Sequence, residues 1–310
     1  MPQTINSAFD VLSGLTVDEA LANPSFMPEL VLESLDGEEF QNLLFRTVNA
    51  DSNVIAFREV LPDYLEDDVE HVAEFGEIPV SDPTGGELKT AMIRKLGLAI
   101  RVSWEQRNDN DIDAVQRELR ARANTIVRRQ AADAIAALNA ADIQELAADV
   151  AWDQPGATPS TNILDAMELV QGAEDGEGHY YGFNPDVLLI NPTTLTMLKR
   201  NDEVQKLYIG NMASENPLFK WVATEPVMFG SLQVAKSFAV PKGEAWLGVQ
   251  GAAGFMAQRE PAWVSDFYEE RGQSGRGGSN QSWRSDYTHR RAFGVDAPKS
   301  LVKLTGLVTG

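Results

Sequence analysis

The spacing of apolar side chains predicts one strand and one long helix near the middle of the chain. Between residues 96 and 104 apolar positions alternate strictly with small or polar ones, which is the period of a half-buried strand. From 111 to 145 apolar side chains recur every three or four positions, and residues 108–154 contain neither glycine nor proline. That spacing predicts a single helix over 111–145, about 50 Å long at the α-helical rise per residue.

A second strand is predicted at residues 54–60, before a turn signal made by Asp82, Pro83, Thr84, Gly85 and Gly86. We therefore expect residues 54–104 to form a long two-stranded excursion with its tip near Pro83. An isolated two-stranded ribbon is marginally stable in water. The excursion is expected to need a partner surface, for which another copy of the chain is a candidate.

The first 37 residues show little sustained period and are interrupted by three prolines. This pattern predicts an extended arm that needs another surface to lie on. A short helix is predicted at 38–47, where three apolar side chains share one face.

Residues 153–160 form a linker rich in Pro and Gly, so a boundary is expected there. A helix is predicted at 161–171, a glycine-rich loop at 172–185 and a buried strand at 186–190. Asn191 followed by Pro192 predicts a helix start, with Asn as N-cap and Pro at the first helical position, and this helix runs to about residue 200. Further strands are predicted at 232–237, 244–249, 262–268, 283–293 and 299–305, with a mobile glycine-rich loop at 272–279.

Length and composition limit the class of protein. The chain has 310 residues, enough for about two domains. It has no cysteine, which excludes disulfides, thiolate nucleophiles and Cys-containing zinc sites. Its net charge of -20 argues against a general nucleic-acid binder. No apolar run is long enough to span a membrane and the N-terminus does not resemble a signal peptide, so we expect a soluble, cytosolic protein with no membrane partner.

The charge is unevenly distributed along the chain. Residues 1–88 hold 19 acidic and 2 basic side chains, whereas residues 89–129 hold 10 basic and 5 acidic ones. Two interpretations stay open: solvated faces of one monomer, or an acidic arm that meets a basic surface on a neighbouring copy. The predicted helix carries five arginines within thirteen residues. They suit either phosphate contact or, as we favour, a solvated face paired with acidic neighbours.

Candidate chemistry is sparse. The three histidines, His71, His179 and His289, lie far apart and match no metal-ligand spacing. Acidic residues at 109, 111 and 113 imitate the start of a calcium loop, but the required glycine and glutamate are missing, and a helix N-terminus explains them better. The loop at 272–278 resembles a phosphate cradle only loosely, because it lacks the Lys-Ser/Thr of a P-loop. We expect no catalytic residue, no metal and no cofactor.

Four short motifs follow one another along the chain. They are Phe-Gly-Glu-Ile-Pro at 75–79, Ile-Arg-Val-Ser-Trp-Glu at 100–105, Val-Leu-Leu-Ile-Asn-Pro at 187–192 and Arg-Ala-Phe-Gly-Val-Asp-Ala-Pro at 291–298. The first motif resembles the extended loop of one protein family, and the second resembles the entry to that family's spine helix. The third resembles the strand-to-helix step of the axial domain, and the fourth resembles the closing strands of the peripheral domain. That family is the major capsid proteins of tailed double-stranded DNA phages, with the Hong Kong 97-type fold. The resemblance spans nearly the whole chain and is strongest to phages that infect actinobacteria.

The resemblance implies an α+β fold with five segments. They are an N-terminal arm at 1–48, an extended β-hairpin loop at 49–105, the spine helix of a peripheral domain at 106–152, an axial domain at 153–250, and the C-terminal strands of the peripheral domain at 251–310.

The resemblance also implies a structural function and not an enzymatic one. Copies of the chain would assemble as hexamers and pentamers into an icosahedral capsid around double-stranded DNA, which is enclosed without sequence-specific binding. The implied partners are other copies of the chain, a separate scaffolding protein and a portal, in a virion assembled in the host cytoplasm. Isopeptide crosslinking is not carried over, since Lys89 and Lys95 have no identifiable partners. The expected contact residues are Asp82, Pro83, Thr84, Gly85, Gly86, Arg117, Arg120, Arg128, Arg129, Arg290 and Arg291.

Two other functions are considered. An encapsulin-type shell shares this fold but holds protein cargo, and such shells usually lack a long N-terminal arm. A soluble α/β enzyme with an acidic metal site would require a convergent carboxylate cluster, which the sequence does not reveal.

Overall fold

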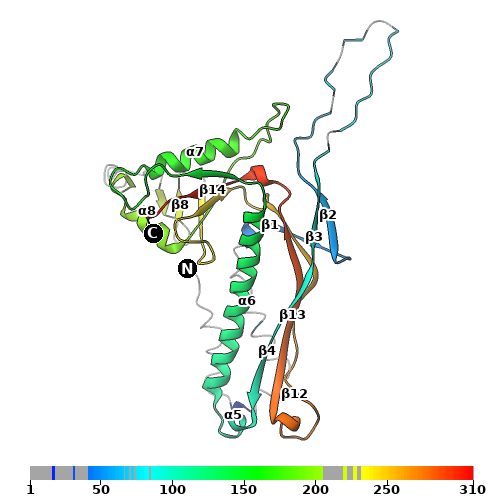
Figure 1. The fold of residues 1–310 in the computed structure, drawn as a ribbon, viewed down its shortest axis with the longest axis vertical. Coiled ribbons are helices and arrows are strands. Elements are labelled where there is room, and N and C mark those ends of the chain that lie inside the picture. The colour runs from blue at the N-terminus through cyan, green and yellow to red at the C-terminus, as the bar shows by residue number, and fades with distance from the viewer. Residues whose placement is uncertain are drawn as a thin grey trace.

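The computed structural model describes residues 16–17, 31, 41–65, 67–69, 71–72, 75–83, 85–204, 219–221, 226–228 and 232–309. Two β-sheets and one long helix form the body, and a thin loop projects from it beyond one end (Figure 1). The mixed helix and sheet architecture agrees with the expected α+β class.

One sheet is built around a long central strand. β13 (Ser282–Gly294) pairs along one side with β4 (Arg94–Ser103) and along the other with β11 (Gly254–Val264) and β12 (Tyr268–Glu269). β1 (Phe45–Asn49) adds to β11 in parallel. The strands predicted at 96–104 and 283–293 are therefore confirmed.

Two predictions near this sheet are wrong in their bounds. The strand predicted at 262–268 is β11, which runs from 254 to 264; register shifts between Gln258 and Trp263 break the alternation that locates a strand. The helix predicted at 38–47 ends at Leu44 of α4 (Gln41–Leu44), because the following residues pair with β11 as β1, and residues 38–40 lie outside the described residues. Most of the predicted arm lies outside the described residues. Within it Val17 and Val31 are fully buried against α6 and the first sheet.

The long helix is α6 (Ile112–Ala140), preceded by the short α5 (Trp104–Asn108). Asp111 caps it, because its carboxylate accepts a hydrogen bond from the Ala114 backbone N–H at 3.0 Å. The helix ends five residues before the predicted position. Residues Gln144–Ala147 instead form β5, which pairs with the C-terminal strand, so backbone pairing overrides their helical propensity.

The second sheet has seven strands in the order β5-β14-β10-β6-β9-β8-β7. The bounds of the six beyond β5 are β14 Leu301–Thr305, β10 Ala245–Gly248, β6 Val187–Ile190, β9 Leu232–Lys236, β8 Pro226–Met228 and β7 Phe219–Trp221. The central β6 and β10 are buried at every position, which explains their continuous apolar sequence. β5 precedes the expected axial segment 153–250 and β14 follows it. The second sheet therefore includes strands from both sides of that segment.

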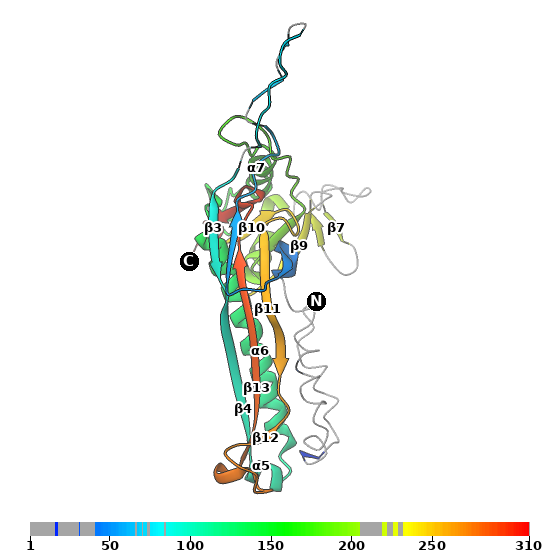
Figure 2. The ribbon, with the colours of Figure 1, turned by 90° about the vertical axis from the view of Figure 1, so that its right-hand side faces the viewer.

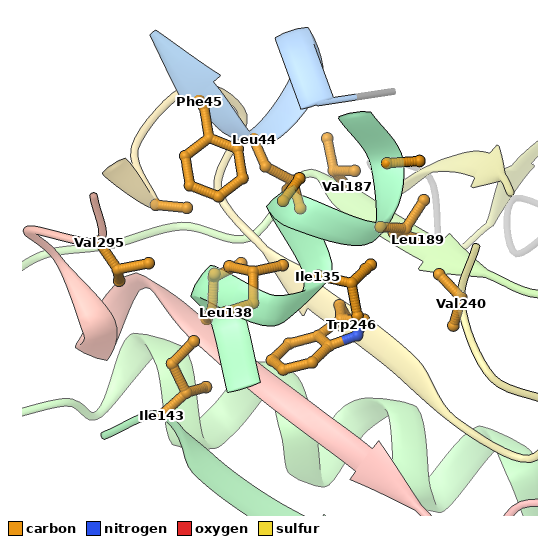
Figure 3. Packing of buried hydrophobic residues seen from close by; sticks show 14 of the residues in the cluster. Leu44, Phe45, Ile135, Leu138, Ile143, Val187, Leu189, Val240, Trp246 and Val295 are labelled. Atoms are coloured by element: carbon orange, nitrogen blue, oxygen red, sulfur yellow. The ribbon is translucent and has the colours of Figure 1, made fainter. Parts of the chain in front are cut away.

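Helices cover both faces of the second sheet. α7 (Pro159–Gln171) and α8 (Pro192–Arg200) pack on one face. The predicted N-cap of α8 is confirmed, since Asn191 Oδ1 accepts from the Thr193 backbone N–H at 2.9 Å. The C-terminal half of α6 covers the other face, where Ile135 and Leu138 pack with the fully buried Trp246 (Figure 3). α6 therefore joins the two sheets into one body.

The projecting loop leaves the body through a short ribbon, β2 (Val54–Arg58) paired with β3 (Leu88–Met92). The predicted strand 96–104 is not the return limb of this ribbon, because it forms β4 in the first sheet. Only Ile93 separates β3 from β4, so the chain passes from the ribbon directly into the body. The tip is also not at Pro83, which lies opposite Leu65 in an isolated bridge, and the chain reverses between these two residues.

Candidate subunit interface

The loop from Glu59 to Glu87 exposes both acidic and apolar side chains. It contains ten acidic residues and no lysine or arginine. Phe75 is 100% exposed, Val69 96% and Val80 92%. Apolar side chains left in water along a thin ribbon are typical of a surface that another protein covers.

Two contacts fix the root of the loop to the body. The Val60 backbone N–H donates to the carbonyl of Asp296 at 2.7 Å. The ring of Tyr64 stacks on His179, with 4.1 Å between the ring centroids and 16° between their planes. His179 Nδ1 lies 3.1 Å from the Asp175 carboxylate, which holds the imidazole in place.

The residues of the predicted turn lie along the returning limb of the loop. Asp82, Pro83 and Gly85 are exposed, and Thr84 lies outside the described residues. Gly86 is required by a close approach, since a Cβ there would lie 2.0 Å from the carbonyl oxygen of Glu59. The glycine therefore lets the two limbs meet and does not turn the chain.

Lys89 is already engaged at the root of the loop. It forms an ion pair with Glu59 and lies 4.0 Å from Glu87. The hydrogen bond to Glu59 raises the pKa of Lys89 above its usual value. This lysine is therefore held as part of the β2–β3 ribbon.

The arginines of α6 fall into two groups that the sequence does not separate. Arg117, Arg128 and Arg129 are exposed, and Arg120 is half-buried. Arg129 pairs with Asp133 one turn later at 2.9 Å, as expected for a solvated helix face. Arg122 instead is 2% exposed and belongs to the core of the first sheet.

Arg122 links α6 to the central strand β13. Its Nη1 donates to the Ser285 carbonyl at 3.2 Å and to Ser285 Oγ at 3.0 Å. Burial lowers the pKa of Arg122 to about 10. This side chain therefore orients the helix on the sheet and is not available to a partner.

Arg290 and Arg291 stand in a row of like charge across two strands. In the register of β13 and β4, Arg290 lies opposite Lys95 and Arg291 opposite Arg94. Within the described residues, Arg290 Nε lies 3.1 Å from the carboxylate of Glu260. Like charges directly opposite each other destabilise a strand pair, so an acidic side chain beside this row stabilises it.

A groove of about 420 Å³ opens beside this row, between α6 and the sheet. We call it the α6 groove and define it by Arg94, Leu96, Arg129, Asp133, His289 and Arg291, which line it together with parts of β3. His289 is 4% exposed, and burial, with a smaller contribution from the charge of Arg291, lowers its pKa to about 4. The sequence did not indicate Arg94 or His289 as site residues, because the groove forms only when three distant segments pack together.

The glycine-rich loop at 272–279 does not provide an anion site. Its backbone N–H groups at Ser274 and Gly278 donate to the carboxylate of Glu269. These hydrogen bonds lower the pKa of Glu269. The chain's own carboxylate therefore fills the position that a phosphate would need.

Among the described residues, no group of three or more His, Asp or Glu side chains is arranged to hold a metal ion. In the same part of the chain, no helix is long and apolar enough to cross a bilayer.

Solved structures share this fold across most of their length. The capsid of cyanophage P-SCSP1u matches with a TM-score of 0.59 and 13% identity, covering 87% of this chain and 88% of that one. A structure from Mycobacterium phage Bobi matches at 0.54 and 14%, covering 86% and 89%. A virus-like particle from Pyrococcus furiosus matches at 0.56 and 13%, covering 90% and 98%. No curated protein sequence matches the chain.

The family is shown by sequence. A family model described as phage capsid protein matches residues 87–304, more than two thirds of the chain. The matched range begins at the root of the loop and includes α6 and nearly all of both sheets. This chain belongs to the phage capsid protein family and is a structural, shell-forming protein with the Hong Kong 97-type fold.

Proposed function

We propose that copies of this chain assemble as hexamers and pentamers into an icosahedral capsid that encloses double-stranded DNA. The observation that carries the proposal is the loop from 59 to 87, which exposes apolar side chains that its own subunit does not cover. Many weak contacts of this kind multiply when each subunit both gives and receives a loop. The subunit is then complete only as part of a shell.

The charge distribution supports a loop that lies on a neighbour. The loop carries ten acidic side chains and no lysine or arginine, whereas exposed arginines lie on α6 and β4 and half-buried ones on β13. Opposite charges steer the copies together and fix their register. We assign the candidate contact residues to this contact between copies. They are residues 82–86 on the loop and Arg117, Arg120, Arg128, Arg129, Arg290 and Arg291 on the body.

Within the shell, the seven-stranded sheet with α7 and α8 is assigned to the axial domain at capsomer centres, and the first sheet with α6 to the peripheral domain. The net charge of -20 favours DNA that is enclosed without sequence-specific binding. A separate scaffolding protein, a portal and assembly in the host cytoplasm complete the proposed pathway.

Expression of the chain with and without its loop tests the proposal. Replacement of residues 61–85 by a short Gly-Ser linker keeps β2, β3 and the root pair of Glu59 with Lys89. We expect the full chain to form capsomers or shells in negative-stain images and the shortened chain to remain a folded subunit. Equal particle yield from both chains would contradict the role of the loop.

A second candidate is an encapsulin-type shell that holds protein cargo. A virus-like particle from Pyrococcus furiosus matches this fold with a TM-score close to that of the cyanophage capsid. This match is the reason to retain the encapsulin-type shell as a candidate function. The contents of purified particles distinguish the two functions, since a phage capsid holds DNA and an encapsulin-type shell holds an enzyme.

A further inference from the structure

The projecting loop is attached to its own body at two places along its length. Near its start, the Val60 backbone N–H donates to the carbonyl of Asp296 at 2.7 Å. Farther out, the ring of Tyr64 stacks on His179 with 4.1 Å between the ring centroids. A rod held at one point pivots about it, whereas a second attachment fixes its direction. The contact between Tyr64 and His179 is therefore placed to decide where the loop points.

His179 belongs to the segment between α7 and β6, which reaches from the second sheet toward the root of the loop (Figures 1 and 2). This segment folds back on itself, since Glu174 and Tyr180 lie opposite each other in an isolated antiparallel bridge. We call residues 174–180 the α7–β6 hairpin. The hairpin is a projection of the second sheet, so the stack on His179 joins the loop to that sheet.

Asp175 holds His179 in place from inside the hairpin. Its Oδ1 accepts hydrogen bonds from the backbone N–H groups of Glu177 and His179, both at 2.9 Å, and its Oδ2 lies 3.1 Å from His179 Nδ1. The hydrogen bond from the His179 backbone, followed by the one from Glu177, lowers the pKa of Asp175, which keeps the carboxylate ionised at neutral pH. A ring that is already held in this way loses little further freedom when Tyr64 stacks on it.

The two limbs of the loop are joined on both sides of Tyr64. Toward the root, Gly86 passes so close to Glu59 that a Cβ at position 86 would lie 2.0 Å from the carbonyl oxygen of Glu59. Toward the tip, Leu65 lies opposite Pro83 in an isolated bridge. A contact made by Tyr64 therefore positions both limbs and not one strand alone.

We propose that the α7–β6 hairpin is a strut that sets the direction of the loop before subunits meet, with His179 as the positioning residue. The contact lies at the surface, because Tyr64 is 50% exposed and the His179 side chain 34%. A surface aromatic pair shifts a two-state equilibrium by about two- to tenfold, so the strut biases the loop without locking it. A loop directed in advance loses less freedom on binding a partner. This consequence for assembly rests on the proposed function, whereas the strut itself is a property of the single subunit.

The direction of the loop can be measured in the dispersed subunit, because the chain has no cysteine that would interfere with labelling. Spin labels are attached at Val69→Cys on the loop and Asp165→Cys on α7, two exposed positions. We expect one narrow distance distribution in the otherwise native chain, and we expect His179→Ala to widen it by about twofold or more. Tyr64→Phe keeps an aromatic ring and should keep the narrow distribution. Equal widths in the native chain and His179→Ala would overturn the strut.

Three controls separate the strut from a general disturbance of the fold. Asp175→Ala keeps the ring of His179 but removes the carboxylate that holds it, so the distribution should widen less than in His179→Ala. Glu177→Gln changes the charge of the same hairpin and keeps its backbone N–H, so the width should not change; widening as large as in His179→Ala would overturn the specific role of the ring. Labels at Asn124→Cys on α6 and Asp165→Cys report on the body and should keep their distance in every variant.

Assembly measures what the strut contributes to the proposed function. In sedimentation, His179→Ala should raise the protein concentration at which particles first form by about two- to tenfold, and Tyr64→Phe should leave it nearly unchanged. If the chain forms no particles but His179→Ala widens the distribution, the strut stands and the capsid proposal fails. If particles form at the same concentration in the native chain and in His179→Ala, the role of the strut in assembly is overturned while the capsid proposal stands.

Discussion

The buried His289 makes the subunit sensitive to acid. Burial, helped by the charge of Arg291, lowers the pKa of His289 from about 6.5 to about 4 in the folded chain. Because the folded pKa lies below the unfolded one, the stabilising contribution is fully present above about pH 6.5. It is lost as the pH falls toward 4, where protonation favours the unfolded chain.

The size of the effect follows from the shift. A difference of about 2.5 pKa units at about 1.4 kcal/mol per unit corresponds to about 3 kcal/mol in full. Between pH 7 and pH 4.5 most of this, about 2 to 3 kcal/mol, is removed from the free energy of unfolding. The charged groups that share the groove with His289 are Arg94, Arg129, Asp133 and Arg291, and the charge of Arg291 opposes protonation of the imidazole.

The measurement is direct, because the chain has only three histidines. Histidine-selective NMR titration of the dispersed subunit gives one curve per ring, and His289→Gln assigns the buried one. We expect its midpoint well below 5.5, and we expect urea unfolding of His289→Gln to lose about 2 to 3 kcal/mol less between pH 7 and 4.5 than the native chain does. His71→Gln is the control, since that side chain is exposed on the loop. A midpoint above 6 for His289, or equal acid losses in all three proteins, would refute the reasoning.

Four further predictions concern the core, the loop and the body. Trp246→Ala removes a 1%-exposed side chain between α6 and the second sheet and should lower the free energy of unfolding by about 3 to 5 kcal/mol in urea titration. Gly86→Ala places a methyl group against the backbone of the opposite limb, so hydrogen exchange at the root of the loop should accelerate while the body is unchanged. Glu269→Ala removes the carboxylate that holds the glycine-rich loop, which should raise proteolysis at 272–279 without changing the Tm of the body by more than a few degrees. Arg290→Glu with Arg291→Glu should impair shell assembly while the subunit still folds, and normal particle yield would count against an electrostatic contact between copies.

Apolar spacing and capping residues predicted the elements whose burial is the same along their whole length or whose ends depend on adjacent residues. β4 alternates strictly because one of its faces lies on α6, and β6 is continuously apolar because both faces of its sheet are covered. The start of α8 was predictable because Asn191 and the proline after it act on the backbone next to them. These elements are confirmed with shifts of one or two residues at their ends.

Elements defined by distant partners were not predictable in the same way. β5 has a helical sequence and becomes a strand only because the C-terminal β14 lies beside it. β11 contains register shifts that hide its period. No strand was predicted at the position of β3, and residues 96–104 were expected to form the return limb in its place. In each case pairing between segments far apart in sequence decides the structure.

The candidate interface shows the same limit. The sequence identified the acidic loop and the arginines of α6 from charge alone. The spacing of these arginines did not show that Arg122 is buried while Arg117 and Arg128 are exposed, because all three lie on the same helix and only packing against β13 separates them. Arg94 and His289 become neighbours in one groove only in the folded subunit.

The central claim is that this chain builds a closed shell. Electron microscopy of the purified, full-length protein tests it most directly, with image classification for hexameric and pentameric units. We expect icosahedral particles, or isolated capsomers of six and five subunits, in which a loop from one subunit covers the first sheet of its neighbour. A protein that remains monomeric or forms only a small closed oligomer, at concentrations and salt conditions where capsid proteins are tested for assembly, would contradict it.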